Sequence, residues 1–128
     1  MRWNQLADDV PRALALAEIL CGAGHADATF ELSERFVVGG MLLKVLGVTK
    51  LPQEVEDFVT TFDPDKLNLV DACARLNLAT DRDKVSLVKV VADIVRADEK
   101  VDKSERNFVT RLGKALGIPA ADVKALLG

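Results

Sequence analysis

Two acidic clusters contain the residues of this sequence whose types and spacing could do chemistry. Each has the pattern Asp-x-x-x-(Asp/Glu)-x-x-Glu. The members are Asp27, Glu31 and Glu34 in the first cluster and Asp98, Asp102 and Glu105 in the second. The last two carboxylates of each cluster lie three residues apart at an expected helix start, so they share one side of its first turn. The leading aspartate precedes them in a loop and can fold back toward them.

Three converging carboxylates without sulfur suit a hard divalent cation such as Ca²⁺, Mg²⁺ or Mn²⁺. Helix capping is the main alternative, because a carboxylate at a helix start and another three residues later stabilise the helix N-terminus without any metal. Capping explains Asp102 and Glu105 well, explains Glu31 less well, and does not require Asp27 or Asp98. A protein-docking surface is the third alternative.

Other established chemistries fit the sequence poorly. A calcium loop of the EF-hand type counted from Asp98 would have Lys103 in place of its glycine and Val109 in place of its bidentate glutamate. His25 is the one histidine of the chain, so no Ser/His/Asp or Cys/His catalytic set can be assembled with confidence. We therefore expect His25 to be a loop residue and the protein not to be an enzyme.

Composition limits the remaining functions and the compartment. Cys21 and Cys73 stand alone in apolar stretches, so we expect both thiols to be reduced and buried. The net charge is −3, and basic residues are not clustered as nucleic-acid binding would require. No stretch is apolar for long enough to span a membrane, and Asp8 and Asp9 lie where a signal peptide would be apolar. We expect a cytoplasmic protein.

Helical periodicity accounts for nearly all of residues 9–127 and predicts about seven helices. Their expected starts are Asp9, Leu32 or Ser33, Pro52, Asp63-Pro64, Thr80, Asp102 and Pro119. Gly47 and Gly117 are expected to end two of them. The helices that start at Asp9 and Thr80 are apolar on almost every side and should be central. Trp3 and Leu6 form either a flap over the core, which we favour, or an exposed anchor for a partner.

The chain contains an internal repeat. Asp9 falls on Thr80 at a shift of 71 positions, and the apolar residues that follow coincide. The same shift places Ser33-Glu34-Arg35 on Ser104-Glu105-Arg106, and Leu46-Gly47 falls on Leu116-Gly117 after one deleted residue. We expect one domain over residues 1–128, with repeat units at about 9–62 and 80–128 and a bridging helix at about 64–76. The two units should pack face to face about a pseudo-twofold axis.

The run LVKVVADIVRADEKVDKSER, from Leu87 to Arg106, resembles the TerB-like family when taken with Leu116-Gly117. That family includes tellurite-resistance proteins and the N-terminal domain of certain DnaJ-like membrane co-chaperones. The resemblance is strong over residues 80–128 and weaker over residues 9–62. Glu99, and Ala28 in the first unit, stand where the family usually has glycine.

The resemblance implies an all-α bundle with an internal duplication and an acidic surface that binds divalent metal through the two clusters. It places the chain in bacterial systems of tellurium and chemical stress, phage defence or membrane-associated signalling, where a peripheral membrane complex is one setting. We expect a non-enzymatic module with a protein partner and no nucleic acid. The alternative is a metal-independent helical adaptor for protein–protein interaction.

Overall fold

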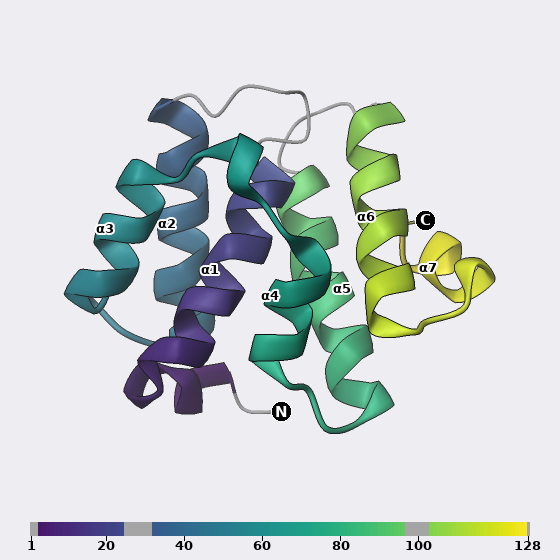
Figure 1. The fold of residues 1–128 in the computed structure, drawn as a ribbon, viewed down its shortest axis with the longest axis horizontal. Coiled ribbons are helices and arrows are strands. Elements are labelled where there is room, and N and C mark those ends of the chain that lie inside the picture. Colours follow the sequence, from purple (N-terminus) through teal and green to yellow (C-terminus); the bar gives the residue numbers. More distant parts are fainter. Residues whose placement is uncertain (1–2, 25–31, 97–102, 128) are drawn as a thin grey trace.

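The computed structural model describes residues 3–24, 32–96 and 103–127, and every regular element in these ranges is a helix. The α-helices are α1 (Val10–Gly24), α2 (Leu32–Leu46), α3 (Gln53–Thr61), α4 (Leu69–Leu76), α5 (Asp81–Arg96), α6 (Lys103–Leu116) and α7 (Ala120–Leu127). Two short 3-10 helices are η1 (Trp3–Asp8) and η2 (Pro64–Lys66). The expected all-α bundle is confirmed (Figure 1).

Local signals in the sequence set several of these helix ends. The side chains of Asp9 and Thr80 each accept a hydrogen bond from the backbone N–H three residues on, at 3.4 and 3.1 Å. They cap α1 and α5 as expected. Gly47 and Gly117 follow α2 and α6 with φ of 67° and 78°, a left-handed conformation that glycine adopts without a steric penalty.

The helices form two units of three, α1–α3 and α5–α7, and within each unit all three helices contact one another. The units meet through α1 and α5, which lie in the middle of the bundle with α2 and α3 on one side and α6 and α7 on the other (Figure 1). In addition α1 contacts α6, and α2 contacts α5. These reciprocal contacts are the arrangement expected for face-to-face packing of a duplicated unit.

The expected bridging helix over residues 64–76 is interrupted, which corrects the prediction that one helix follows Asp63-Pro64. The proline opens only the short η2, and α4 begins at Leu69. Asn68 separates them because its backbone is extended, with φ −126° and ψ 94°, and its side chain accepts a hydrogen bond from the N–H of Asp71 at 3.0 Å. Two residues, Leu67 and Asn68, therefore separate η2 from α4, and Asn68 acts as the cap of the second helix.

One continuous hydrophobic core runs through both units. Leu16, Leu20, Leu42, Leu87 and Leu112 have no exposed surface and come from α1, α2, α5 and α6. Each such leucine stabilises the fold by about 1.5–3 kcal/mol. None of the helices in the described ranges is long and apolar enough to cross a membrane.

The N-terminal segment covers one edge of this core. Leu6 in η1 is fully buried, and the half-buried Trp3 donates a hydrogen bond from Nε1 to Ser86 Oγ at 3.2 Å. The indole therefore joins η1 to α5 in the second repeat unit. The expectation of a flap is confirmed.

Candidate functional site

The structure describes only two of the six predicted metal ligands, Glu34 and Glu105. Four of them, Asp27, Glu31, Asp98 and Asp102, lie outside the described residues, as does His25. Glu34 is the third residue of α2 and is half-buried, and Glu105 is the third residue of α6. These two glutamates therefore occupy equivalent places in the first turns of equivalent helices. Within the ranges that the structure describes, no three His, Cys, Asp or Glu side chains form a group that could hold a metal.

The four helix ends that flank the two acidic clusters in the sequence lie at one end of the molecule. The C-terminal ends of α1 and α5 and the N-terminal ends of α2 and α6 lie together at this end, which we call the junction end (Figure 1). Helix N-termini present backbone N–H groups that favour carboxylates, and helix C-termini present carbonyl oxygens without an intrahelical partner. Carboxylates and carbonyl oxygens are the ligands that hard cations prefer.

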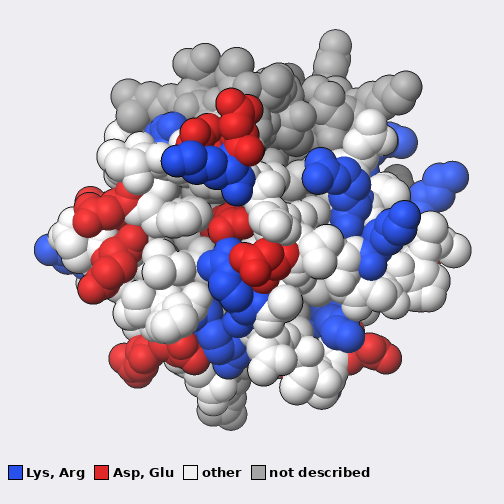
Figure 2. Space-filling view, viewed as in Figure 1, with Lys and Arg blue, Asp and Glu red and all other residues white. Residues whose placement is uncertain are grey.

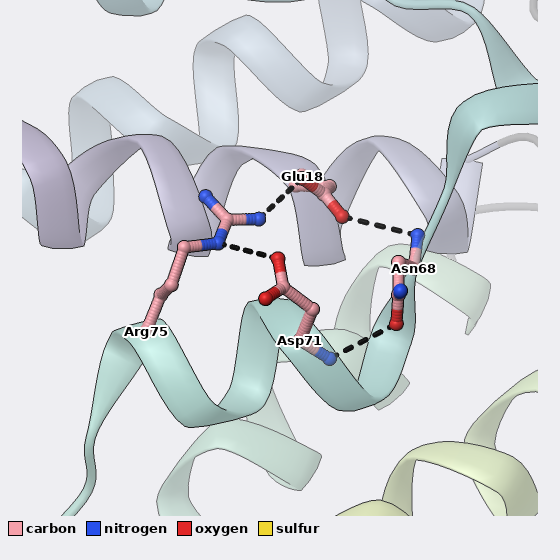
Figure 3. Close-up of polar contacts among 4 residues, drawn as sticks. All are labelled: Glu18, Asn68, Asp71 and Arg75. Carbon is pink, nitrogen blue, oxygen red and sulfur yellow. Dashed lines mark hydrogen bonds and ion pairs between the residues drawn. The ribbon is translucent and has the colours of Figure 1, made fainter.

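A buried carboxylate that the sequence analysis missed lies in the middle of α1. Glu18 is 8% exposed, and Arg75 Nη2 donates a hydrogen bond to its Oε1 at 2.6 Å. The backbone N–H of Asn68 donates to Oε2 at 3.2 Å, and Arg75 Nε donates to Asp71 Oδ2 at 2.8 Å (Figure 3). Both oxygens of Glu18 therefore have partners on the bridge, and the network joins α1 to α4.

This network is a structural clamp. Burial lowers the pKa of Arg75, but hydrogen bonds and charges from Glu18 and Asp71 oppose burial and raise the pKa overall. The guanidinium stays charged, and its hydrogen bond to Glu18 joins the two helices. The sequence signal for it was a single acidic residue within the apolar run that follows Arg12 in α1, since a buried carboxylate needs a cation or hydrogen-bond donor.

The two thiols are free and buried, as expected. Burial raises the pKa of Cys21 to about 12 and the pKa of Cys73 to about 11. Both thiols are therefore protonated at neutral pH. A protonated, buried thiol is neither a good metal ligand nor a nucleophile.

Arg35 fixes α2 against the end of α3. Its Nη1 donates hydrogen bonds to the backbone carbonyls of Val59 and Thr60, the latter at 2.9 Å, and its Nη2 donates to the carbonyl of Phe62 at 3.2 Å. These carbonyls belong to the last turn of α3 and its C-cap, which lack intrahelical partners. The two helices are held at a fixed spacing.

That spacing leaves an open hollow of about 510 Å³ between α2 and α3. We call it the α2–α3 groove, and its apolar lining comes from Phe36, Gly39, Gly40, Leu43, Leu51 and Val59. Phe36 stands at its edge with 74% of its surface exposed. The sequence analysis did not identify this groove, although two adjacent glycines inside a helix were a visible signal.

Charge is divided between the two repeat units. Figure 2 shows acidic side chains over α3 and basic side chains over α6. The exposed residues include Glu54, Glu56 and Asp57 on α3 and Arg106 and Arg111 on α6. The viewed face is therefore of mixed sign, with the acidic side on the first unit.

Comparison with known proteins identifies the family. No curated protein and no solved structure matches the chain. The family model described as tellurite resistance protein TerB matches residues 13–127, which include all seven α-helices except the first three residues of α1. The chain therefore belongs to the TerB family.

Proposed function

We propose that this chain is a non-enzymatic TerB module of a cytoplasmic stress-response or signalling system in bacteria, and that it binds a divalent cation at the junction end. The observation that supports this proposal is the shared position of four helix ends, from which both acidic clusters extend. The family's description as a tellurite resistance protein supports the stress-response setting.

The ligands would come from both repeat units. The proposal depends most on Asp27 and Asp98, because helix capping does not explain either residue. Glu31 and Asp102 directly precede the first residues of α2 and α6, and Glu34 and Glu105 follow within the first turns. Ca²⁺, Mg²⁺ and Mn²⁺ are the ions whose preference for oxygen ligands fits this set.

Calorimetric titration with each of the three ions tests the proposal. The wild-type chain should release or absorb heat and gain thermal stability with metal, because an ion that binds only the folded state stabilises it. The double variant Asp27→Asn/Asp98→Asn should lose both effects. The matched control is Glu54→Gln/Asp57→Asn, which removes the same charge from exposed positions on α3. Absence of heat and of stabilisation at millimolar metal would rule the cation out.

A metal-independent adaptor is the second candidate, and exposed apolar side chains favour it. Phe36, Val37 and Val70 are 74%, 45% and 69% exposed, and they lie on α2 and α4. An adaptor would bind proteins encoded beside it through such residues. Its capture of those proteins should survive Asp27→Asn/Asp98→Asn and chelation of metal, and should fail when the exposed apolar residues are replaced by asparagine.

A further inference from the structure

We propose that Arg35 is a positioning residue of the cation site at the junction end. Its guanidinium fixes the first turn of α2 to the end of α3, and that turn carries Glu34, one of the proposed ligands. This inference rests on the proposed function. It adds a residue that acts on the ion only through Glu34.

The end of α3 is the anchor for Arg35. Its Nη1 donates hydrogen bonds to the carbonyl oxygens of Val59 and Thr60, the latter at 2.9 Å. Its Nη2 donates to the carbonyl oxygen of Phe62 at 3.2 Å. Val59 and Phe62 are buried, and α3 ends at the junction end (Figure 1). Three hydrogen bonds from one planar group to a packed backbone therefore restrict the start of α2.

Core packing of the described side chains in α2 begins only after its first turn. The first of them to be buried is Val38, whereas Phe36 and Val37 are 74% and 45% exposed and Glu34 is half-buried. A first turn also has backbone N–H groups without an intrahelical partner, so it needs an outside contact to stay fixed. The hydrogen bonds of Arg35 provide that contact.

In the second repeat unit, apolar packing holds the equivalent turn. The shift of 71 positions places the exposed Val37 on Phe108, which is only 4% exposed. The same shift places Arg35 on Arg106, which is exposed. The start of α6, which carries Glu105, is therefore fixed by a buried aromatic ring. We expect its position to be independent of Arg106.

The charge of Arg35 and its positioning role affect cation affinity in opposite directions. A positive charge near the carboxylates repels a divalent cation, so removal of the charge alone should tighten binding. Loss of a positioned ligand should weaken binding, and removal of a contact that orients a metal ligand typically costs about 10–100-fold in affinity. The direction of the change therefore separates the two effects.

Calorimetric titration of single variants with Mn²⁺ tests the direction. Arg35→Gln should weaken binding at least about tenfold. The matched control Arg106→Gln removes the same charge at the equivalent position and should bind Mn²⁺ as tightly as the wild-type chain or more tightly. Arg35→Lys keeps the charge but loses the planar fork of donors, so it should also weaken binding. Titration below the melting temperature of each variant keeps every chain folded.

A double-mutant cycle shows whether Arg35 acts through Glu34. The double variant Glu34→Gln/Arg35→Gln should bind Mn²⁺ no more weakly than Glu34→Gln alone, because the positioned ligand is already lost. Water proton relaxation should show the same gain of coordinated water on Mn²⁺ in Arg35→Gln as in Glu34→Gln. Additive losses of affinity would mean that Arg35 only stabilises the fold, and would overturn the proposal.

The wild-type chain separates this inference from the proposed function. A wild-type chain that binds Mn²⁺, together with Arg35→Gln that binds it equally or more tightly, would overturn this inference alone. A wild-type chain that binds no Mn²⁺ would overturn it as well. If Ca²⁺ and Mg²⁺ also fail to bind, the proposed function is overturned with it.

Discussion

Helices α1 and α5 occupy equivalent places in the two repeat units, yet they are buried to different extents. Ten of the 15 residues of α1 are buried, including a glutamate and a glycine. In α5 the residues that face away from the core, such as Lys89 and Asp93, are exposed. The difference arises from the bridge, because α4 packs more extensively on α1 than on any other helix. The duplication therefore gives α1 and α5 equivalent places in the fold, and the packing of α4 on α1 makes their burial unequal.

The same shift of 71 positions shows where the bridge acts. Glu18 corresponds to Lys89, and Gly22 corresponds to Asp93. Glu18 binds α4 and the residue before it, whereas a β-carbon at Gly22 would lie 2.8 Å from Phe108 Cε2 and 3.0 Å from Leu67 Cδ2. Glu18 and Gly22 are therefore buried in α1, whereas the equivalent Lys89 and Asp93 are exposed in α5. Substitutions at equivalent positions should therefore have unequal effects.

The largest difference in stability is expected between substitutions at the buried Glu18 and at the equivalent Lys89. Glu18→Ala removes the partner of both Arg75 and the Asn68 N–H, so the free energy of unfolding should fall by about 2–3 kcal/mol. Lys89→Ala at the equivalent exposed position should change it by less than about 0.5 kcal/mol. Urea unfolding of the two variants measures the difference. Equal effects would mean that the network contributes nothing to the asymmetry.

The next largest difference in stability is expected between substitutions at Gly22 and at the equivalent Asp93, because of the steric contacts at Gly22. Gly22→Ala forces Phe108 or Leu67 to move, and overpacking of this kind destabilises by about 1–3 kcal/mol, partly offset by the higher helix propensity of alanine. Asp93→Ala should be neutral or slightly stabilising, because the side chain is exposed. Thermal melting compares the two. A melting temperature that rises in Gly22→Ala would show that the contact relaxes without cost.

The sequence predicted those parts of the fold that depend on neighbouring residues. Caps at Asp9 and Thr80 and glycine stops at Gly47 and Gly117 act within one helical turn, so they could be read directly. The start of α4 was predicted too early, because Asn68 competed with the more obvious Asp63-Pro64 signal. A local pattern could not decide between two successive caps.

Features that depend on distant residues could not be derived in this way. Glu18 and Arg75 are 57 positions apart, and their pairing follows from the packing of α4 on α1. The groove beside Phe36 likewise follows from the spacing that Arg35 fixes between α2 and α3. Glu34 and Glu105 are the third residues of α2 and α6, the positions that the repeat aligns. Convergence of the six carboxylates stays a prediction.

A smaller difference between α1 and α5 is expected in how stability depends on alkaline pH, because only α1 carries a thiol at this position. Cys21 corresponds to Ala92, and burial raises its pKa from 9.0 to about 12. Between these values the folded protein keeps a proton that the unfolded chain has lost, so stability is unaffected below about pH 9 and falls as pH rises above it. The slope attributable to this thiol is at most about 1.4 kcal/mol per pH unit.

Cys21→Ala, which introduces the residue of the second unit, should flatten that slope. Urea unfolding in reducing buffer between about pH 8 and 10 gives the slope for each protein. Cys73 is present in both, with its pKa raised to about 11, so the difference between the two proteins isolates Cys21. Identical slopes for the two proteins would contradict the assignment of this pH dependence to Cys21.

The smallest effect is expected where η1 meets α5. Ser86 corresponds to the fully buried Ala15 of α1, but here the hydroxyl accepts a hydrogen bond from Trp3 Nε1 at 3.2 Å. Ser86→Ala leaves the half-buried indole without this partner, so stability should fall by only about 0.5–1 kcal/mol. Trp3 is the one tryptophan of the chain, and its fluorescence reports on this contact alone.

Two outcomes are informative for Ser86→Ala. A red shift of the emission without loss of helicity would show that the hydroxyl holds η1 against α5, and that the second unit uses this position to bind the N-terminal segment. An unchanged emission maximum would show that burial of Leu6 suffices to hold the flap. In that case the asymmetry between α1 and α5 would rest on the contacts that Glu18 and Gly22 make with the bridge and α6.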